Sequence, residues 1–274
     1  MNAAVTKKQI ELSLADRFGH IFERYERLPA ETLSTGISTI DNALHGFPRG
    51  AITEIHGQSS SGRTSLMLSV LAAATSREET CALVDCNDTF DLSSAANAGV
   101  DFNRLLWVRC GHRLERAFKA VDLILHGGGF GSVTVNLCDV APKIVRRVIS
   151  TWWFRFRRAI ENTPTALIVL TPVNAVRSCA VLALEVKNEA SVWPSTLSLV
   201  SENSYSGFTV ETEQRSHLSL IKSSVRTDSP QTHSHFLRAM NIRVNRERPV
   251  HWQPAEIKFQ ATSMSGLVIF ANLR

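Results

Sequence analysis

The sequence has few cysteines, and their spacing excludes most structures that depend on them. The five cysteines are scattered between positions 81 and 179, their number is odd, and no Cys-x-x-Cys pair occurs. Several stand inside apolar runs, where a cysteine usually acts as a small buried hydrophobe. We therefore expect a reducing, cytoplasmic environment, without a disulfide framework or a zinc site.

The sequence also lacks long hydrophobic runs. No stretch approaches the roughly 18 apolar residues of a membrane-spanning helix, and the lysines near position 8 are not followed by an apolar segment. We expect neither a signal peptide nor a membrane span. The absence of a Gly-x-Ser-x-Gly elbow argues against a serine hydrolase. His233 and His235 have no cysteine or carboxylate at ligand spacing, so no metal site is expected there.

The remaining composition is that of an ordinary globular protein. With 274 residues, 44% hydrophobic and 20% charged, the chain is long enough for one large α/β domain. The net charge of +5 permits nucleic acid or an acidic protein as a partner and requires neither. Nine Lys and Arg stand against three Asp and Glu from Arg215 onward, which places the basic surplus in the C-terminal region.

The segment 52–71 has the layout of a phosphate-binding loop between a strand and a helix. A β-branched run leads into a loop whose glycines, Gly57 and Gly62, are five positions apart, and an apolar helical pattern follows. Loop amides and the positive end of the helix dipole favour an anion there. The residues predicted to bind nucleotide are Gly57, Gln58, Ser59, Ser60, Ser61, Gly62, Arg63, Thr64 and Ser65. Thr64 would place its hydroxyl on Mg²⁺, and Arg63 stands where a lysine is usual.

Strands alternate with helices through the middle of the chain. Apolar runs predict buried strands at 81–85, 105–108, 133–138 and 166–170, and helices at 93–99, 114–125 and 144–160. This alternation is typical of right-handed βαβ units and a mainly parallel sheet. An amphipathic helix at 8–27 precedes the core, and it packs either on its own domain or on a neighbouring protomer in self-association.

The pattern changes after Ala175. Short runs at 181–186, 197–200, 208–211 and 218–221 predict antiparallel strands that extend the sheet, and 223–234 has the composition of a linker. We therefore divide the chain into an N-terminal amphipathic helix at 1–30, a P-loop core at 31–222, and a linker with a basic tail at 223–274.

From position 33 to about 110 the sequence resembles the core of the RecA superfamily of recombination ATPases. The residues that carry the resemblance are Thr35, Gly36, Ile37, Asp41, Leu44 and the segments 48–50, 54–64, 81–85 and 98–101. Within the superfamily it is most similar to the ImuA family, RecA-like accessory proteins of bacterial translesion mutagenesis, through 127–131, 151–158, 177–179 and 248–254. The resemblance implies an α/β, RecA-like P-loop core with a mainly parallel central sheet, an antiparallel extension on its C-terminal side, and ATP with Mg²⁺ as ligand.

Hydrolysis of the RecA type needs four groups, and each is changed here. Arg63 replaces the lysine; it keeps the charge but is longer and planar. The resemblance puts the residue that activates water on Asn87, which cannot accept a proton. It puts the Walker B aspartate on Asn136, and the polar sensor after the fifth strand falls at Pro172. We therefore predict a pseudo-ATPase that binds nucleotide weakly or not at all.

Three carboxylates are the only candidates for the missing groups. Asp85 ends the second strand, Asp88 is adjacent to Asn87, and Asp139 is three residues after Asn136. If the strand continues to Asp139, this side chain points to the opposite face of the sheet.

Two basic regions are candidates for contact with a partner or single-stranded DNA. The run 151–158 combines aromatic residues and arginines, and a stripe of Val148, Trp152, Phe156 and Ile160 predicts a helix packed on the sheet. Arginines beside aromatics also suit protein hot spots and single-stranded DNA. The contact candidates are Trp153, Arg155, Arg157, Arg158, Arg243, Arg246 and Arg248.

Two functions remain open from the sequence. The first is an accessory protein of DNA damage tolerance, in translesion synthesis and the SOS response, that recruits a specialised polymerase and RecA. The resemblance implies an ImuB-type, polymerase-like partner for the C-terminal region and a cytoplasmic, nucleoid-associated location. The second is an active DNA-dependent ATPase that remodels a recombinase filament, for which Asp85, Asp88 or Asp139 must supply the missing carboxylates.

Overall fold

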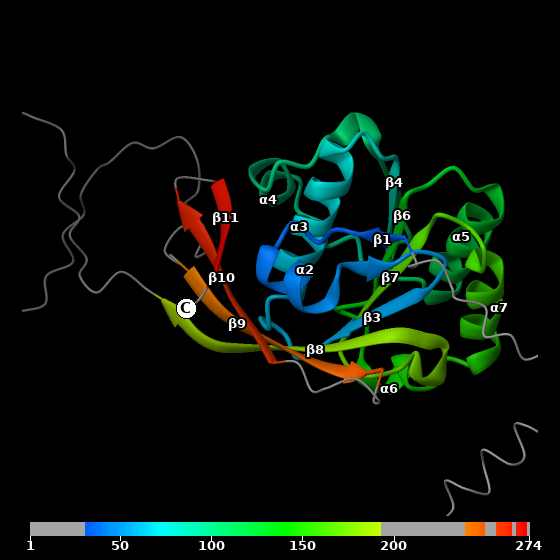
Figure 1. The fold of residues 1–274 in the computed structure, drawn as a ribbon. Coiled ribbons are helices and arrows are strands. Elements are labelled where there is room, and N and C mark those ends of the chain that lie inside the picture. Colours follow the sequence, from blue (N-terminus) through cyan, green and yellow to red (C-terminus); the bar gives the residue numbers. More distant parts are fainter. Residues whose placement is uncertain (1–30, 193–238, 250–255, 265–266, 273–274) are drawn as a thin grey trace, which may run out of the picture. The chain divides into compact units, whose positions relative to one another are not determined.

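The computed structural model describes residues 31–192, 239–249, 256–264 and 267–272. Within these residues a nine-stranded sheet has the order β11-β10-β9-β8-β3-β7-β6-β4-β5 (Figure 1). A separate two-stranded sheet pairs β1 (Thr32–Leu33) with β2 (Phe47–Pro48). The predicted N-terminal helix, the strands predicted between 197 and 221, and the linker at 223–234 lie outside the described residues.

Six neighbouring strands of the large sheet run parallel to one another. They are β3 (Ile52–His56), β4 (Cys81–Asp85), β5 (Leu105–Arg109), β6 (Ser132–Asn136), β7 (Ala166–Thr171) and β8 (Ala180–Val192). Because helices connect most of these strands, the prediction of an α/β fold with a mainly parallel central sheet is confirmed. β6 ends at Asn136, so Asp139 lies beyond the strand rather than on it.

Helices cover both faces of the parallel strands (Figure 1). One face packs on α2 (Ser38–Leu44), α3 (Arg63–Ser76) and α4 (Leu92–Asn97), and the other on α5 (Leu114–Gly127) and α7 (Ser150–Ile160). Successive strand residues alternate between the two cores: in β4, Cys81 and Leu83 join the first core, whereas Ala82 and Val84 join the second. The apolar runs in the sequence are therefore strands buried on both faces.

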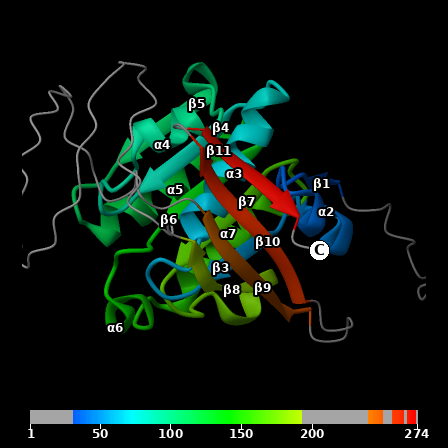
Figure 2. The ribbon, with the colours of Figure 1, turned by 90° about the vertical axis from the view of Figure 1, so that its left-hand side faces the viewer.

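Three C-terminal strands extend the sheet in antiparallel fashion (Figure 2). β8 is parallel to β3 and antiparallel to β9 (Ala239–Arg248), and β10 (Glu256–Met264) and β11 (Leu267–Asn272) follow. The sequence predicts a basic tail from 223 onward, but the residues of β9, β10 and β11 belong to the core sheet. The reason is their alternation: Ile242, Val244 and Phe259 are fully buried against the α2–α3 face.

The helix predicted at 144–160 is two helices. α6 (Pro142–Val145) ends before Arg146, and Ile149 is extended (φ −67°, ψ 136°) ahead of α7. A proline in the first turn of α6 is compatible with a helix that begins at Pro142, two residues earlier than predicted. The buried residues of α7 are Trp153, Phe156 and Ile160, and Val148 and Trp152 of the predicted stripe are partly buried against the same core.

Trp153 is therefore a core residue and not a contact residue. It is 1% exposed and packs edge-on against Phe118 of α5 at 5.1 Å between ring centroids. Phe156 stacks on the same ring at 5.5 Å. The hypothesis that Trp153 contacts DNA or a partner is wrong for this structure, because the side chain lies in the core between α5 and α7.

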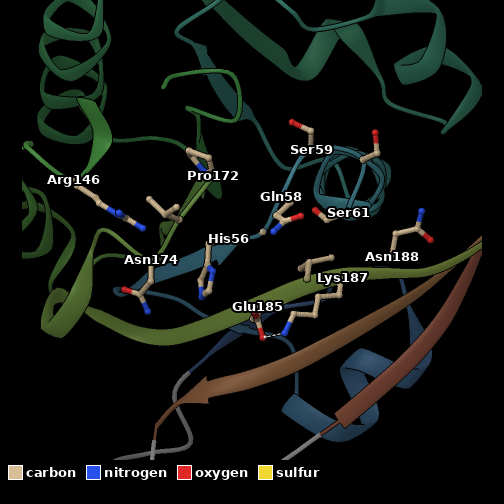
Figure 3. A pocket seen from close by; sticks show the side chains of 14 residues that line it. His56, Gln58, Ser59, Ser61, Arg146, Pro172, Asn174, Glu185, Lys187 and Asn188 are labelled. Atoms are coloured by element: carbon tan, nitrogen blue, oxygen red, sulfur yellow. Dashed lines mark ion pairs between the residues drawn. The ribbon is translucent and has the colours of Figure 1, made fainter. Parts of the chain in front are cut away.

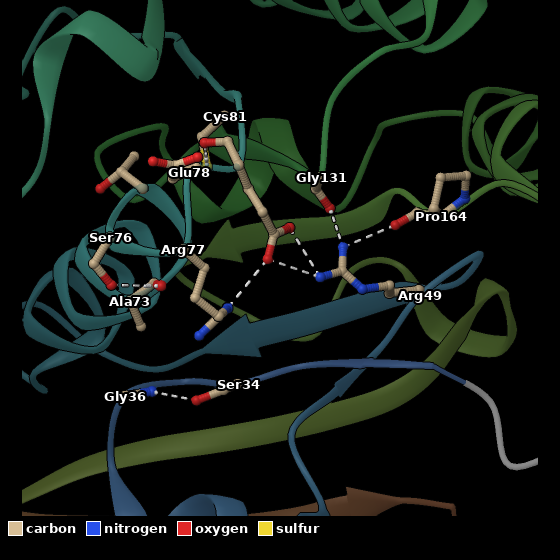
Figure 4. Close-up of polar contacts among 12 residues, drawn as sticks. Ser34, Gly36, Arg49, Ala73, Ser76, Arg77, Glu78, Cys81, Gly131 and Pro164 are labelled. Atoms are coloured by element: carbon tan, nitrogen blue, oxygen red, sulfur yellow. Dashed lines mark hydrogen bonds and ion pairs between the residues drawn. The ribbon is translucent and has the colours of Figure 1, made fainter.

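The amino ends of the parallel strands are tied together by Arg49 (Figure 4). Its guanidinium donates two hydrogen bonds to the Glu79 carboxylate, at 2.9 and 2.8 Å, and further bonds to the carbonyl oxygens of Gly131 and Pro164. These partners precede β4, β6 and β7. The segments 48–50 and 127–131, which the resemblance singled out, thus hold the edge of the sheet opposite the phosphate-binding loop.

The burial of Trp153 leads to a test of the corrected α7 face. We expect Trp153→Ala to lower the free energy of unfolding by about 3–5 kcal/mol, because it leaves a cavity among Phe118 and Phe156. Phe154→Ala, at a side chain that is 52% exposed, is the matched control and should change stability by no more than about 0.5 kcal/mol. Urea unfolding measures both, and equal stability of the two variants would contradict this packing.

Candidate functional site

The predicted phosphate-binding loop lies at the carboxyl edge of the sheet, between β3 and α3. Both glycines of the loop are needed because other residues of the protein fill the space that a side chain would take. A Cβ on Gly57 would lie 2.3 Å from the carbonyl oxygen of Val186 in β8. Gly62 has φ +99°, and a Cβ there would lie 2.3 Å from Cδ1 of Ile242 in β9. β8 and β9 therefore press closely on the loop, which the sequence analysis did not predict.

Arg63 points into the protein. It is 5% exposed, and its Nε donates to Ser61 Oγ at 3.2 Å. One Nη donates to the carbonyl oxygen of Gln58 at 3.2 Å, and the other donates to the carbonyl oxygen of Thr171 at the end of β7. The guanidinium thus joins the phosphate-binding loop to the neighbouring strand. All of these acceptors are neutral oxygens of the protein.

Glu54 holds the loop that follows β7. Its Oε1 accepts hydrogen bonds from Thr171 Oγ1 at 3.1 Å and from the amides of Ala175 and Val176 at 2.6 and 3.1 Å. Its other oxygen, Oε2, is buried and has no hydrogen-bond partner among the described residues. Burial raises the pKa of this carboxyl above its usual value. Glu54 fixes the segment 171–176 beside the phosphate-binding loop.

The positions of the missing catalytic groups are engaged in loop structure. Asp85 is fully buried; its Oδ2 accepts from the Phe90 amide at 2.8 Å, and its Oδ1 accepts from Asn136 Nδ2 at 3.2 Å. Asn136 Oδ1 accepts from the Cys138 amide at 3.1 Å. The Walker B position is therefore an amide that connects Asp85 to the turn after β6.

The two other candidate carboxylates are also used locally. Asp88 Oδ1 accepts from the amides of Cys110 and Gly111, at 2.9 and 3.2 Å, so it caps the turn after β5. Asp139 is exposed and accepts from Thr89 Oγ1 at 2.9 Å. Within the described residues none of Asp85, Asp88 and Asp139 hydrogen-bonds to Thr64.

Asn87 adds no proton acceptor near the loop. Its Nδ2 contacts Nδ1 of His112 at 3.3 Å. An amide cannot remove a proton from water at neutral pH. Asn87 therefore does not take the place of the catalytic base.

A polar chain beside the loop joins β3 to the C-terminal strands. His56 Nε2 lies 2.9 Å from Glu247 Oε2 of β9, and Asn174 Nδ2 donates to the same oxygen at 2.8 Å. His56 is the last residue of β3, immediately before Gly57. The end of the phosphate-binding strand is therefore tied to residue 247 of the segment expected to be a tail.

Two pockets flank the phosphate-binding loop. The larger has a volume of about 590 Å³, and its wall includes His56, Ser59, Arg146, Asn174 and Lys187 (Figure 3). The smaller, of about 300 Å³, is lined by residues 60–65 with Asn188, Ser191 and Met240. Volumes of this order are typical of small-molecule sites. All nine residues predicted to bind nucleotide border one or both pockets.

The residues fit ATP better than they fit its magnesium ion. The loop amides, the start of the 14-residue helix α3 and the two pockets offer an anion site of suitable size. Thr64 is exposed at the smaller pocket. In the part of the chain that the structure describes, however, no group of three or more His, Cys, Asp or Glu side chains is arranged to hold a metal ion.

The arginine candidates for partner contact separate into two groups. On α7, Arg157 and Arg158 are exposed, whereas Arg155 is paired with Asp122 of α5 at 2.5 Å. In β9, Arg243 is paired with Glu189 and Glu256, and Arg246 and Arg248 are half-buried. Among the described candidates, the exposed arginines that are available for a partner are therefore Arg157 and Arg158 on α7.

Sequence reasoning missed the residues that β8 and β9 bring to the loop. Lys187, Asn188 and Glu247 lie more than 120 residues from Gly57, and no short motif links them to it. His56 was detectable, because it ends a buried strand whose carboxyl end faces the ligand crevice. None of the described helices is sufficiently long and apolar to span a membrane.

A parallel sheet with a phosphate-binding loop between its β3 strand and α3 defines the chain as a P-loop α/β protein. The model of the RecA N-terminal domain matches residues 5–147, which is just over half of the chain. The chain belongs to this RecA family, in agreement with the resemblance of its motifs.

The relatives by sequence include RecA proteins of Chlorobaculum and Chlorobium species. Protein RecA of Chlorobaculum parvum is 40% identical over 108 residues, which are 39% of this chain and 31% of that protein. Protein RecA of Chlorobium chlorochromatii and of Chlorobium limicola are 39% and 38% identical over 111 residues, 40% of this chain and 31% of each relative. The chain thus spans less than a third of the length of these relatives.

The contacts of Arg63 predict a structural role that is independent of nucleotide. We expect Arg63→Ala to lower the free energy of unfolding by about 1.5–3 kcal/mol in nucleotide-free protein, because three acceptors lose a charged donor. Ser59→Ala, at an exposed position of the same loop, is the control and should be nearly neutral. Chemical denaturation checks both; an Arg63→Ala protein as stable as the wild type would show that the guanidinium does not hold the loop.

Proposed function

We propose that this RecA-family chain is an accessory protein of DNA damage tolerance that acts by assembly rather than by nucleotide turnover. It binds ATP as a ligand, and it recruits a specialised, polymerase-like partner of the ImuB type together with RecA. Its place of action is the cytoplasm, at the nucleoid. The ImuA-like segments 127–131 and 151–158 support this choice within the family.

The observation that carries the proposal is the engagement of Arg63. The cation of the phosphate-binding loop borders the smaller pocket, but its two Nη atoms are bound to the carbonyl oxygens of Gln58 and Thr171. In a hydrolysing enzyme, the loop cation stabilises the negative charge that develops on the phosphate in the transition state. To do so, it must be free to contact the phosphate. Binding at the loop amides does not need this group, so the geometry favours retention of a ligand over its hydrolysis.

The engaged carboxylates support the same conclusion. Asp85 and Asp88 each accept backbone amides that define the turns after β4 and β5. If either took the role of catalytic base, it would leave those amides without their acceptor. The alternative function, a DNA-dependent ATPase that remodels a recombinase filament, requires either that rearrangement or a catalytic role for Asp139, which is exposed and accepts from Thr89 Oγ1.

The first test of the proposal is turnover. We expect a fluorescent ATP analogue to bind, and phosphate release to be lower by about 10²–10⁴-fold than in an ATPase that keeps its base, with or without single-stranded DNA. DNA-stimulated release that is lost in Asp85→Asn or Asp139→Asn would establish the alternative ATPase instead.

The second test concerns the partner. Removal of the residues after 223 also removes β9–β11 of the sheet, so point variants are preferable to truncation. We expect the double variant Arg157→Glu/Arg158→Glu on α7 to reduce capture of the polymerase-like partner at least about tenfold. The two arginine contacts are lost, and the new carboxylates repel an acidic surface on the partner. Arg113→Glu, at an exposed position preceding α5, is the matched control.

The pull-down tests the recruitment role and the α7 contact surface separately. If the wild-type chain captures no polymerase-like partner, the recruitment role is wrong. If the α7 variant and the Arg113→Glu control capture it equally, α7 is not the contact surface.

A further inference from the structure

The segment 142–160, which forms α6 and α7 (Figure 1), has basic side chains and no acidic one. Its cations are Lys143, Arg146, Arg147, Arg155, Arg157 and Arg158, and all of them are exposed. Arg155 is paired with Asp122 of α5, whereas the others form no ion pair with another residue that the structure describes. The segment therefore presents several cations that carboxylates of a partner can reach.

Large apolar side chains are exposed between these cations. Ile149 is 63% exposed and Phe154 is 52% exposed. The buried residues of α7 are Trp153, Phe156 and Ile160, which pack on the sheet without them. Exposed apolar side chains that lie together and are surrounded by polar residues are typical of a protein contact. The packing of the fold therefore does not account for Ile149 and Phe154.

On α7 the exposed aromatic ring lies next to two arginines. Phe154 is three and four residues before Arg157 and Arg158, and side chains at this spacing are neighbours on a helix surface. The preceding turn presents only the small exposed side chains of Ser150 and Thr151 on that side. One flank of the Phe154 ring is thus bordered by cations, and the other is open to a partner side chain.

The whole segment has the order cation, apolar group, cation. Lys143 and Arg147 come first, Ile149 and Phe154 follow, and the arginines at 157–158 come last. The 11 residues of α7 extend over about 16 Å. An extended peptide covers that length with about five residues. A complementary ligand is therefore a short segment with an apolar residue between two acidic groups.

This arrangement fits a protein segment better than single-stranded nucleic acid. Nucleic acid of that kind is held by aromatic side chains on which its bases stack. The tryptophans of the segment are directed elsewhere: Trp153 is 1% exposed, and the Trp152 ring packs on Phe118 at 5.6 Å between centroids. Ile149 is aliphatic and offers no ring for stacking. An acidic peptide with an apolar residue uses both kinds of exposed side chain.

We propose that α6, α7 and the turn between them bind a short segment of the polymerase-like partner in which an apolar residue stands between two acidic groups. This inference rests on the recruitment role proposed above and names the chemistry of the contact. The apolar residue packs on Phe154 and Ile149. The carboxylates on one side of it pair with the arginines at 157–158, and those on the other side pair with Arg147 and Lys143.

The test identifies the contacting segment directly. The photo-cross-linking residue p-benzoylphenylalanine replaces Phe154 in the full chain, the chain is coexpressed with the polymerase-like partner, and mass spectrometry identifies the cross-linked peptide. We expect an apolar residue with Asp or Glu within about five positions on each side. Lysines in place of those carboxylates should restore capture by the Arg157→Glu/Arg158→Glu variant. A cross-linked segment without carboxylates would overturn the inference.

Point variants measure the contribution of each part. We expect Phe154→Ala and Arg147→Glu each to weaken binding of the partner about tenfold, as for the loss of one anchoring contact. Leu123→Ala, at a side chain of α5 that is 73% exposed and lies outside the segment, is the matched control and should bind as the wild type does. Urea unfolding of the same variants shows whether they keep the stability of the wild type.

The outcomes separate this surface from the role on which it rests. If the wild type captures no polymerase-like partner, the recruitment role fails and this inference fails with it. If Phe154→Ala and Arg147→Glu bind the partner as well as Leu123→Ala does, recruitment stands and the surface is wrongly assigned. If these two variants lose binding of a labelled oligothymidylate but keep the partner, the surface is a nucleic-acid site and the inference is overturned.

Discussion

The carboxyl edge of the sheet depends on one buried guanidinium. Arg63 begins α3, yet it donates to Ser61 and Gln58 of the loop before it and to Thr171 of the adjacent β7. Since Glu54 fixes the segment after Thr171 through its own three hydrogen bonds, the loop and the neighbouring turn form one polar unit. In that unit the cation that a phosphate-binding loop normally presents to its ligand is hydrogen-bonded to oxygen atoms of the protein.

The C-terminal strands complete this unit from the other side. Ile242 lies against Gly62, and Glu247 is bound by His56 and Asn174. Two residues of the sequence-distant β9 therefore contact the loop and the end of β3. β8 also borders the larger pocket, because residues 187 and 188 of β8 project past the end of β3.

The sequence predicted the parts of the fold that depend on local pattern. Buried strands such as β4 and β7 were recognised from apolar runs, and the loop from two glycines between a strand and a helix. β9 and β10 were not recognised, since β9 pairs with β8 across 47 to 65 residues of sequence and about half of the side chains of β9 and β10 are polar. Trp153 was misplaced because the apolar face of α7 is wider than one stripe of side chains: Trp152 and Trp153 both pack on the ring of Phe118. For the site, the position of the loop could be predicted, but the direction of the Arg63 side chain could not. Two of its acceptors are backbone carbonyl oxygens, which every residue type carries, so no sequence pattern reveals them.

The neutral residue at the Walker B position is itself a consequence of this arrangement. Asn136 donates to Asp85 at 3.2 Å, and the two residues are 7% and 0% exposed. An aspartate at 136 would place a second carboxylate against Asp85 in a buried site, where like charges disfavour ionisation of one of them. It would also remove the donor that satisfies Asp85, whose other oxygen holds the Phe90 amide. We therefore expect that a single change at 136 does not restore a metal-binding carboxylate, because Asp85 must first be released from the turn after β4. The proposed loss of turnover then involves the loops together rather than one residue.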